Sequence, residues 1–207
     1  MNKKKLFLVC GPWGSGSSAV AGFLANAGLY APGPYHEIPD PLTSDTYEMD
    51  DFRITIAPFV SEPDLHKVGD SLALVDALNK FITKHFLNNS ENNNSSIMLK
   101  HPTSAFILPE LSEVFDLRII LVLRKLDDIE KTRIRRGWPS FFGEEGAKVI
   151  YANVFNFLIE SSISCYLLRY SDLLKNPVNV LKSISEFVEI TPSKNEENAA
   201  YNFVTKR

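Results

Sequence analysis

A glycine- and serine-rich stretch after residue 10 has the spacing of a phosphate-binding loop. Gly11, Gly16 and Ser18 fit the pattern G-x-x-x-x-G-K-[ST], and Ser17 stands where the pattern has lysine. In such a loop, successive backbone N–H groups and the positive end of the following helix dipole bind an anion. We predict an anion-binding loop with three serine hydroxyls as additional donors, made of Gly14, Ser15, Gly16, Ser17 and Ser18.

The missing lysine narrows the kind of anion that this loop suits. A loop without a charge of its own suits a group less charged than a nucleotide γ-phosphate bound to magnesium, such as the sulfuryl group of a phosphosulfate. The alternative is structural, because the same residues would also form a tight turn between a strand and a helix.

An arginine at the end of an apolar run is a second candidate for anion binding. Arg124 follows the run IILVL, which is typical of a strand at the centre of a parallel sheet, where ligands bind at the carboxyl end. We predict a specific anionic partner for Arg124, with a structural ion pair as the alternative. Thr132 and Arg136 share one face of the next predicted helix, while Lys131 and Arg133 fit a solvated face.

Strands alternate with helices along the chain. The predicted strands cover 6–10, 97–100, 117–124 and 165–170, and the predicted helices cover 17–29, 69–87, 109–115, 127–136, 144–162 and 177–188. Asp127 or Asp128 is expected to cap the fourth of these helices. The expected fold class is α/β, a three-layer sandwich with a P-loop-like parallel sheet flanked by helices, in a single domain over 1–207.

Two segments interrupt this alternation. Residues 30–66 carry six of the twelve prolines and have no sustained period, so we expect a mostly irregular segment on the substrate side of the site. Residues 88–96, with the sequence NNSENNNSS, are predicted to form a mobile polar loop.

Composition and charge argue against several classes of protein. The net charge is −3, which gives no overall field for nucleic acid. The apolar run at 6–10 is shorter than the ~7 residues that a signal peptide needs, and no run approaches the ~20 residues of a membrane span. Cys10 and Cys165 fall in predicted strands and indicate neither a disulfide nor a metal site. We expect a cytoplasmic protein with no membrane span, no metal and no nucleic-acid partner.

Four segments together resemble one enzyme family. They are CGPWGSGSSAVAGFLANAGL at 10–29, LKHPT at 99–103, IILVLRKLDDIEKT at 119–132 and LLRYSDLLKNPVNVLKSISEFVEI at 167–190. Their order and spacing are similar to those of sulfotransferases that use 3′-phosphoadenosine 5′-phosphosulfate (PAPS), particularly the compact bacterial kind. The resemblance implies a P-loop-like fold with PAPS as the cofactor.

The resemblance also implies how PAPS binds. In this family the first loop holds the 5′-phosphosulfate. An arginine at a strand end and a hydroxyl residue eight positions later hold the 3′-phosphate, and these positions are occupied by Arg124 and Thr132. Tyr170 stands where the family has a tyrosine ahead of a helix that begins with proline.

The chain departs from the family in the charge of its loop. Family loops usually carry a lysine or arginine beside the serine, where this chain has Gly14 and Ser17. Lys100 ends a neighbouring predicted strand, so we predict that it supplies the missing charge.

Two residues are candidates for the base that takes the proton of the acceptor. Glu48 resembles the acidic residue that the family has after the first helix, and His101 resembles a histidine of the eukaryotic cytosolic members.

These residues together predict an in-line transfer of a sulfuryl group from PAPS to a hydroxyl acceptor, a carbohydrate or a small alcohol. The aromatic residues of the irregular segment either line the acceptor pocket or belong to the core: Tyr30, Tyr35, Tyr47, Phe52 and Phe59. Two alternatives stay open. A P-loop kinase would share the fold but needs the loop lysine and a strand that ends in aspartate. A non-catalytic nucleotide-binding protein would account for a loop without lysine.

Overall fold

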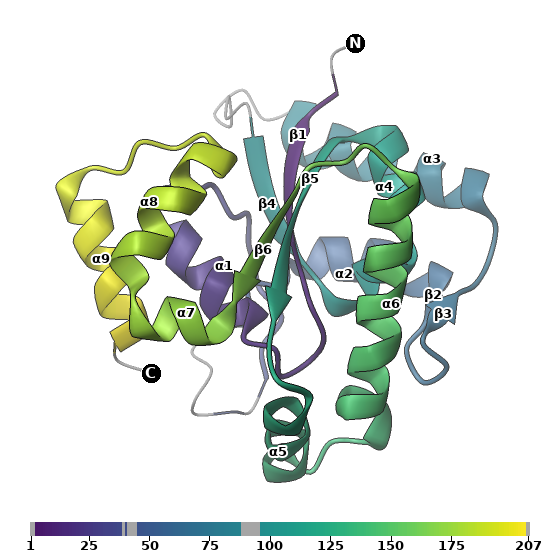
Figure 1. The fold of residues 1–207 in the computed structure, drawn as a ribbon. Coiled ribbons are helices and arrows are strands. Elements are labelled where there is room, and N and C mark those ends of the chain that lie inside the picture. Colours follow the sequence, from purple (N-terminus) through teal and green to yellow (C-terminus); the bar gives the residue numbers. More distant parts are fainter. Residues whose placement is uncertain (1–2, 39, 41–44, 88–95, 206–207) are drawn as a thin grey trace.

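A computed structural model describes residues 3–38, 40, 45–87 and 96–205 of the chain. At its centre is a parallel sheet with the strand order β4-β1-β5-β6 (Figure 1). The strands are β1 (Lys5–Cys10), β4 (Ser96–Lys100), β5 (Asp116–Leu123) and β6 (Cys165–Arg169). Because each neighbouring pair is parallel, these strands all end at the same edge of the sheet.

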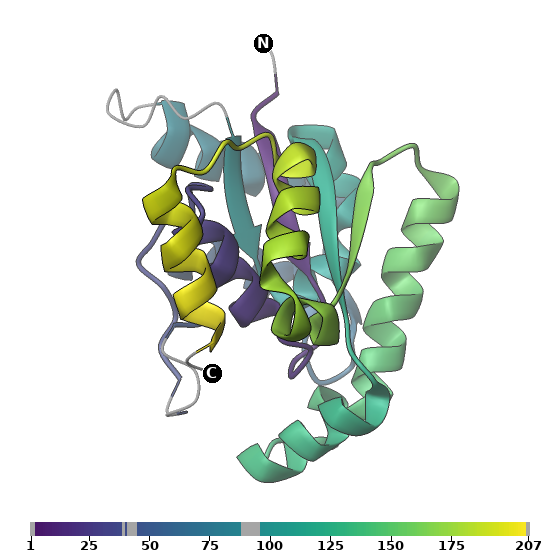
Figure 2. The same ribbon diagram turned by 60° about the vertical axis from the view of Figure 1, so that its left-hand side comes forward.

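Helices cover both faces of this sheet (Figures 1 and 2). One layer contains α1 (Ser17–Asn26), α7 (Tyr170–Lys175), α8 (Pro177–Val188) and α9 (Lys194–Thr205). The other contains α2 (Asp50–Ile56), α3 (Ser71–Ile82), α4 (Leu108–Val114) and α6 (Glu144–Glu160). A further helix, α5 (Leu126–Arg136), lies beyond the carboxyl ends of the strands. The structure therefore confirms the predicted α/β sandwich.

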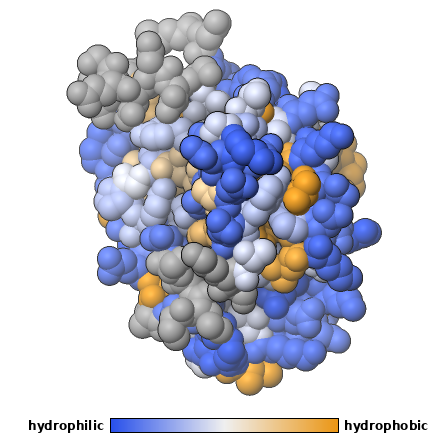
Figure 3. Space-filling model, turned by 90° about the vertical axis from the view of Figure 1, so that its left-hand side faces the viewer, coloured by the Kyte–Doolittle hydropathy of each residue, from blue (hydrophilic) through white to orange (hydrophobic). Residues whose placement is uncertain are grey.

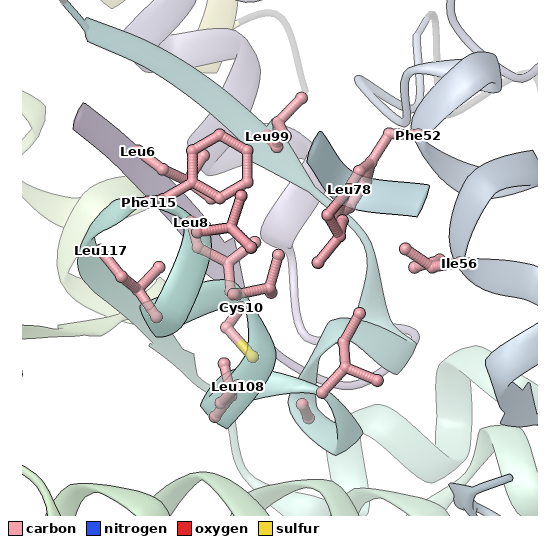
Figure 4. Packing of buried hydrophobic residues seen from close by; sticks show 14 of the residues in the cluster. Leu6, Leu8, Cys10, Phe52, Ile56, Leu78, Leu99, Leu108, Phe115 and Leu117 are labelled. Carbon is pink, nitrogen blue, oxygen red and sulfur yellow. The ribbon is translucent and has the colours of Figure 1, made fainter. Parts of the chain in front are cut away.

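Alternate residues of β1 point into two separate hydrophobic cores. Leu6, Leu8 and Cys10 pack with side chains of the α2, α3 and α4 layer (Figure 4), and Phe7 and Val9 pack with α1 and α8 on the other face. All five side chains are fully buried. Burying one Leu or Phe side chain contributes about 1.5–3 kcal/mol. The two cores therefore hold β1, and with it the start of the glycine-rich loop, from both sides.

The segment 30–66 is more regular than predicted, because α2 lies within it. Phe52 and Ile56 are four residues apart and both buried, so this short helix has an apolar face. One helix of two turns is too short to produce a sustained period. The remaining short elements are η1 (Ala57–Phe59), β2 (Val60–Ser61), β3 (His66–Lys67), η2 (Thr83–Leu87), η3 (Pro102–Phe106) and η4 (Ser140–Phe142).

Two further predictions about helices differ from the structure. α5 begins at Leu126 with no side-chain cap, so neither Asp127 nor Asp128 caps it. Both aspartates lie in its first turn instead, where a negative charge favours the helix dipole. α9 is not among the predicted elements, because its only fully buried apolar residues, Ala200 and Val204, lie in a mainly polar stretch.

The predicted mobile loop at 88–96 lies outside the described residues, except for Ser96, which begins β4. Within the described ranges, no helix is both long and apolar enough to cross a membrane. The face that carries α8 and α9 is mainly hydrophilic, with small separate hydrophobic patches (Figure 3).

Candidate active site

A cavity of about 800 Å³ lies where the strands of the sheet end. Its walls come from the loop after β1, the ends of β4 and β5, α5 and the start of α7. It brings together most of the predicted site residues, namely Gly14, Gly16, Ser17, Ser18, Glu48, Lys100, His101, Arg124, Thr132 and Tyr170. Segments far apart in the sequence therefore meet at the edge where parallel α/β folds bind ligands.

The loop after β1 depends on two glycines with a left-handed backbone. The angle φ is 75° at Gly14 and 92° at Gly16, a region that other residues rarely adopt. A Cβ at Gly16 would lie 2.5 Å from the ring of Tyr170, and one at Gly14 would lie 3.3 Å from Thr132. Because α1 begins at Ser17, the N–H groups of its first turn have no intrahelical partner. The glycines thus let the side chains of Tyr170 and Thr132 pack against the loop, and the first turn of α1 offers backbone donors for an anion in the cavity.

Ser15 is the exception among the predicted loop residues. Its N–H donates to the carbonyl of Pro12 at 3.0 Å, and its side chain is fully buried. Within the described residues its hydroxyl has no hydrogen-bond partner. The turn directs this hydroxyl toward Gly11, where a Cβ would lie 2.8 Å from it. Ser15 therefore lies behind the loop and does not line the cavity, unlike its neighbours.

Arg124 connects the end of β5 to two other parts of the site. Its Nη1 donates to the carbonyl of Gly14 at 2.6 Å and to the hydroxyl of Thr132 at 3.3 Å. Its guanidinium carbon lies 5.2 Å from the ring centre of Tyr170. The hydroxyl of Thr132 in turn donates to the carbonyl of Asp128 at 2.9 Å. Each of these partners is an uncharged group, so the charge of Arg124 is available to an anion in the cavity.

Lys100 is buried at the end of β4, with its ammonium between two elements. Nζ forms an ion pair with Oε1 of Glu48 and donates to the hydroxyl of Ser18 at 3.2 Å. Only 4% of Lys100 and 8% of Glu48 is exposed. Ser18 belongs to the first turn of α1. Lys100 therefore brings a positive charge to the loop whose own sequence has none.

Glu48 has opposing influences on its proton affinity. Burial raises the pKa of Glu48, but the positive charge of Lys100 and the hydrogen bond from it lower the pKa more, so the net pKa lies below its ordinary value. The carboxylate is therefore ionised at neutral pH, and it is ionised because of Lys100.

His101 is neutral, and its hydrogen bonds decide which ring nitrogen carries the proton. Burial lowers the pKa of His101 to about 4. The N–H of Thr103 donates to Nδ1 at 3.3 Å, and the hydroxyl of Thr103, which can also donate, lies 2.7 Å from the same nitrogen. A backbone N–H can only donate, so Nδ1 is the acceptor and the proton lies on Nε2. Nε2 is 3.6 Å from Oε2 of Glu48. His101 thus presents a donor to Glu48 and has no free lone pair on that side.

The aromatic lining of the cavity differs from the predicted one. Trp13, Trp138 and Phe142 line it, with ring centres 4.3 Å apart for Trp13 and Phe142 and 5.6 Å apart for Trp138 and Phe142. The signal for two of them is the stretch GWPSFFG at 137–143, directly after α5. Four of the aromatic residues that were predicted to line the cavity or belong to the core pack with the core: Tyr30, Phe52 and Phe59 in one cluster and Tyr47 in the other. The ring of the fifth, Tyr35, contacts that of Tyr47, with centres 4.9 Å apart.

Several charged residues of the cavity have no counterpart among the predicted site residues. His36, Arg53 and Glu62 lie in its wall near Glu48. Arg135 and Arg136 also line the cavity, and both pair with Asp40, Arg135 at 3.4 Å. That contact joins the segment before α2 to the end of α5.

The chain is similar in structure to several sulfotransferases. No protein-family model and no curated protein matches the sequence. The sulfotransferase domain of the Synechococcus PCC 7002 olefin synthase is 18% identical, with a TM-score of 0.61 over 99% of this chain and 80% of that one. The sulfotransferase domain from the curacin biosynthetic pathway is 19% identical, with a TM-score of 0.63 over 95% and 77%. Sulfotransferase STF1 from Mycobacterium tuberculosis H37Rv is 15% identical, with a TM-score of 0.53 over 100% and 72%. At such identities the likeness shows the fold, and this chain has the fold of the compact bacterial sulfotransferases.

Proposed function

We propose that the protein is a sulfotransferase that moves a sulfuryl group from PAPS to a hydroxyl acceptor, a carbohydrate or a small alcohol. The observation that carries this proposal is the meeting of three groups in one cavity. They are the glycine loop, the Arg124–Thr132 pair and the Glu48–Lys100 ion pair. They suit the three needs of such a reaction, which are two sites for the anionic groups of the donor and a group that removes a proton.

The loop and Arg124 each suit one anionic group of PAPS. The backbone donors around Gly14 and Gly16 suit the 5′-phosphosulfate, because both glycines line the cavity and the first turn of α1 has N–H groups without an intrahelical partner. The guanidinium of Arg124 and the hydroxyl of Thr132 suit the 3′-phosphate, since charge-assisted hydrogen bonds to a phosphate are strong. The ring of Tyr170 lies against both Gly16 and Arg124, so it is close to both of the proposed sites.

Lys100 is suited to stabilise the negative charge that develops on the leaving oxygen during transfer. When bound, PAPS supplies a sulfuryl group that passes to the acceptor oxygen while its bond to the 5′-phosphate breaks. The protein mainly orients such a transfer and stabilises the leaving oxygen. Lys100 reaches the loop through its hydrogen bond to Ser18, so we assign this stabilisation to its ammonium.

Glu48 suits the role of base better than His101 does. A base needs a free lone pair within reach of the hydroxyl proton of the acceptor. In His101, Nδ1 accepts the N–H of Thr103 and Nε2 carries the proton. The carboxylate of Glu48 is ionised and lines the cavity. We therefore assign proton removal to Glu48 and its orientation to His101.

Two measurements test the proposal. Isothermal titration calorimetry should show that adenosine 3′,5′-bisphosphate, the product of PAPS, binds at least about tenfold more tightly than ADP, because only the former has a 3′-phosphate. Transfer of labelled sulfate from PAPS should then occur to at least one member of a panel of sugars and small alcohols. Tighter binding of ADP would contradict the proposal and favour a kinase, although Arg124 stands where a kinase strand ends in aspartate.

A non-catalytic nucleotide-binding protein is the second candidate. The observation that favours it is the loop itself, in which Ser17 replaces the lysine. This candidate shares the affinity for adenosine 3′,5′-bisphosphate but predicts neither transfer nor slow hydrolysis of PAPS. Binding without either reaction would therefore support it.

A further inference from the structure

We infer that an anion bound in the loop takes the ammonium of Lys100 from Glu48, so that Glu48 is free to accept a proton only when the donor is in place. The inference rests on the proposed function and concerns the order of events in the same site. It assigns to Glu48 a second role, as an internal anion that competes with the donor for Lys100.

Lys100 has a contact in each of the two places that this exchange requires. Its ammonium forms an ion pair with Glu48 and donates to the hydroxyl of Ser18 at 3.2 Å. Ser18 lies in the first turn of α1, where backbone donors favour an anion. An anion at this turn would therefore lie beside a hydroxyl that the ammonium already contacts. Glu48 lies on a different segment, 52 positions away from Lys100 in the sequence.

Burial makes the two partners exclude each other. Both side chains of the ion pair are nearly fully buried, so water compensates either charge poorly once the pair separates. Lys100 can leave Glu48 only if another anion takes its place, and the donor is such an anion. Once the ammonium is shared with the donor, the main influence that lowers the pKa of Glu48 weakens, while burial still raises that pKa. The carboxylate then holds a proton more tightly, as a base must.

The other polar groups near Glu48 leave Lys100 as its principal cation. His101 is neutral and faces Oε2 through Nε2 at 3.6 Å. His36 also lowers the pKa of Glu48, but less than Lys100 does, and His36 and Arg53 lie near another carboxylate, that of Asp50, at 3.6 Å and 3.4 Å. Glu62 supplies no positive charge, and its own pKa is raised by burial and then by the negative charge of Glu48.

One consequence is opposite to what a simple binding role predicts. If Glu48 competes with the donor for Lys100, the carboxylate weakens donor binding. Replacing Glu48 by glutamine should therefore tighten the binding of adenosine 3′,5′-bisphosphate by on the order of tenfold, because Glu48 is the carboxylate that pairs with Lys100 in the described part of the chain. A second consequence is an order of binding in which the donor comes first.

Isothermal titration calorimetry with adenosine 3′,5′-bisphosphate tests the inference in four variants. Glu48→Gln removes the competing carboxylate, and Lys100→Met removes the ammonium but keeps the length of the side chain. The double variant Lys100→Met/Glu48→Gln shows whether the effect of Glu48 requires Lys100. Glu62→Gln is the matched control, because it removes another carboxylate of the same cavity wall. Circular dichroism verifies that each variant is folded.

We expect Glu48→Gln to tighten the binding of adenosine 3′,5′-bisphosphate and Glu62→Gln to change this affinity by less than about threefold. In the Lys100→Met background, Glu48→Gln should have no comparable effect on the affinity. Equal tightening with and without Lys100 would overturn the inference, because it would reflect only the removal of a negative charge. Weaker binding by Glu48→Gln would also overturn it. If Glu48→Gln does not fold, Glu48→Asp weakens the same ion pair without a change of charge and should act in the same direction. No binding to the wild-type protein would instead contradict the proposed function.

Discussion

Arg124 and Thr132 lie eight positions apart in the sequence, and Nη1 of Arg124 donates a hydrogen bond to the hydroxyl of Thr132 at 3.3 Å. The pair spans the junction at which β5 ends and α5 begins. Because the same Nη1 donates to Gly14 at 2.6 Å, the guanidinium also contacts the loop. One arginine therefore connects the proposed 3′-phosphate site to the loop that is proposed to hold the 5′-phosphosulfate.

Arg124→Ala should weaken the binding of adenosine 3′,5′-bisphosphate by about 2–5 kcal/mol and that of AMP much less, because AMP has no 3′-phosphate. Thr132→Val, which removes only a hydroxyl, should act in the same direction by about 1 kcal/mol. Arg118→Ala is the matched control, since Arg118 lies near the start of β5 and pairs with Glu189 at 2.8 Å. Both nucleotides can be compared by calorimetry. Equal losses for the two nucleotides would show that the pair does not bind the 3′-phosphate.

Gly14→Ala should weaken the binding of adenosine 3′,5′-bisphosphate by on the order of tenfold or more, because the added Cβ would lie 3.3 Å from Thr132 and crowd the cavity. Gly137→Ala is its control. Gly137 also has a positive φ, 64°, but a Cβ there meets no atom of the described chain within 4 Å. Both substitutions should cost about 1–2 kcal/mol of stability, measured by urea denaturation. If Gly137→Ala weakens binding as much as Gly14→Ala, the loop does not contact the ligand.

The features predicted correctly from the sequence are those with a local signal. The apolar run that ends at Cys10, with the glycine spacing that follows it, is sufficient for a strand, a loop and a helix in that order. The run that ends before Arg124 likewise specifies a buried strand. Since parallel strands end at one edge, the position of Arg124, Lys100 and the loop in one cavity follows from these signals alone.

The features that were not predicted depend on contacts between distant segments. Whether Glu48 meets Lys100 depends on how the segment before α2 folds back over the sheet, which no periodicity in that segment indicates. Likewise, the spacing of the loop does not reveal that Ser15 points behind it, because the turn at Pro12 decides the direction of that side chain. Trp13 and Phe142 meet only in the folded chain.

Intrinsic fluorescence should report ligand binding, because both tryptophans of the chain, Trp13 and Trp138, line the cavity. Adenosine 3′,5′-bisphosphate should change the emission intensity or wavelength. Trp138→Phe should retain most of the change and Trp13→Phe should lose most of it, since Trp13 is adjacent to Gly14 in the loop. A calorimetrically detected ligand that leaves the emission of both variants unaltered would be bound outside this cavity.

Lys100→Met should lower kcat by on the order of 10² or more, because the developing charge on the leaving oxygen loses its ammonium partner. Glu48→Gln should lower kcat by about 10² to 10⁴, as expected for the loss of a base. His101→Asn should cost less, because an asparagine still accepts the N–H of Thr103 and only the orientation of Glu48 changes. The pH–rate profile separates these roles. The acid limb should persist in His101→Asn and disappear in Glu48→Gln, and the reverse result would make His101 the base.

The buried His101 should make the stability of the protein fall in mild acid. Burial lowers the pKa of His101 from 6.5 to about 4, so below pH 6.5 the unfolded chain binds a proton that the folded protein does not. The free energy of unfolding therefore falls as the pH decreases from 6.5 toward 4, and the difference between the two pKa values corresponds to about 3 kcal/mol. His101→Asn has no such group, so urea denaturation between pH 7.5 and 4.5 should show a smaller decrease in the free energy of unfolding for this variant.

Ser104→Ala is the control, because it removes a hydrogen bond of 2.6 Å to the carbonyl of His101 and leaves the imidazole in place. It should lower stability by a similar amount at every pH. If His101→Asn loses as much stability in acid as the wild-type protein, His101 is protonated in the folded state and the assignment of its proton to Nε2 alone is wrong.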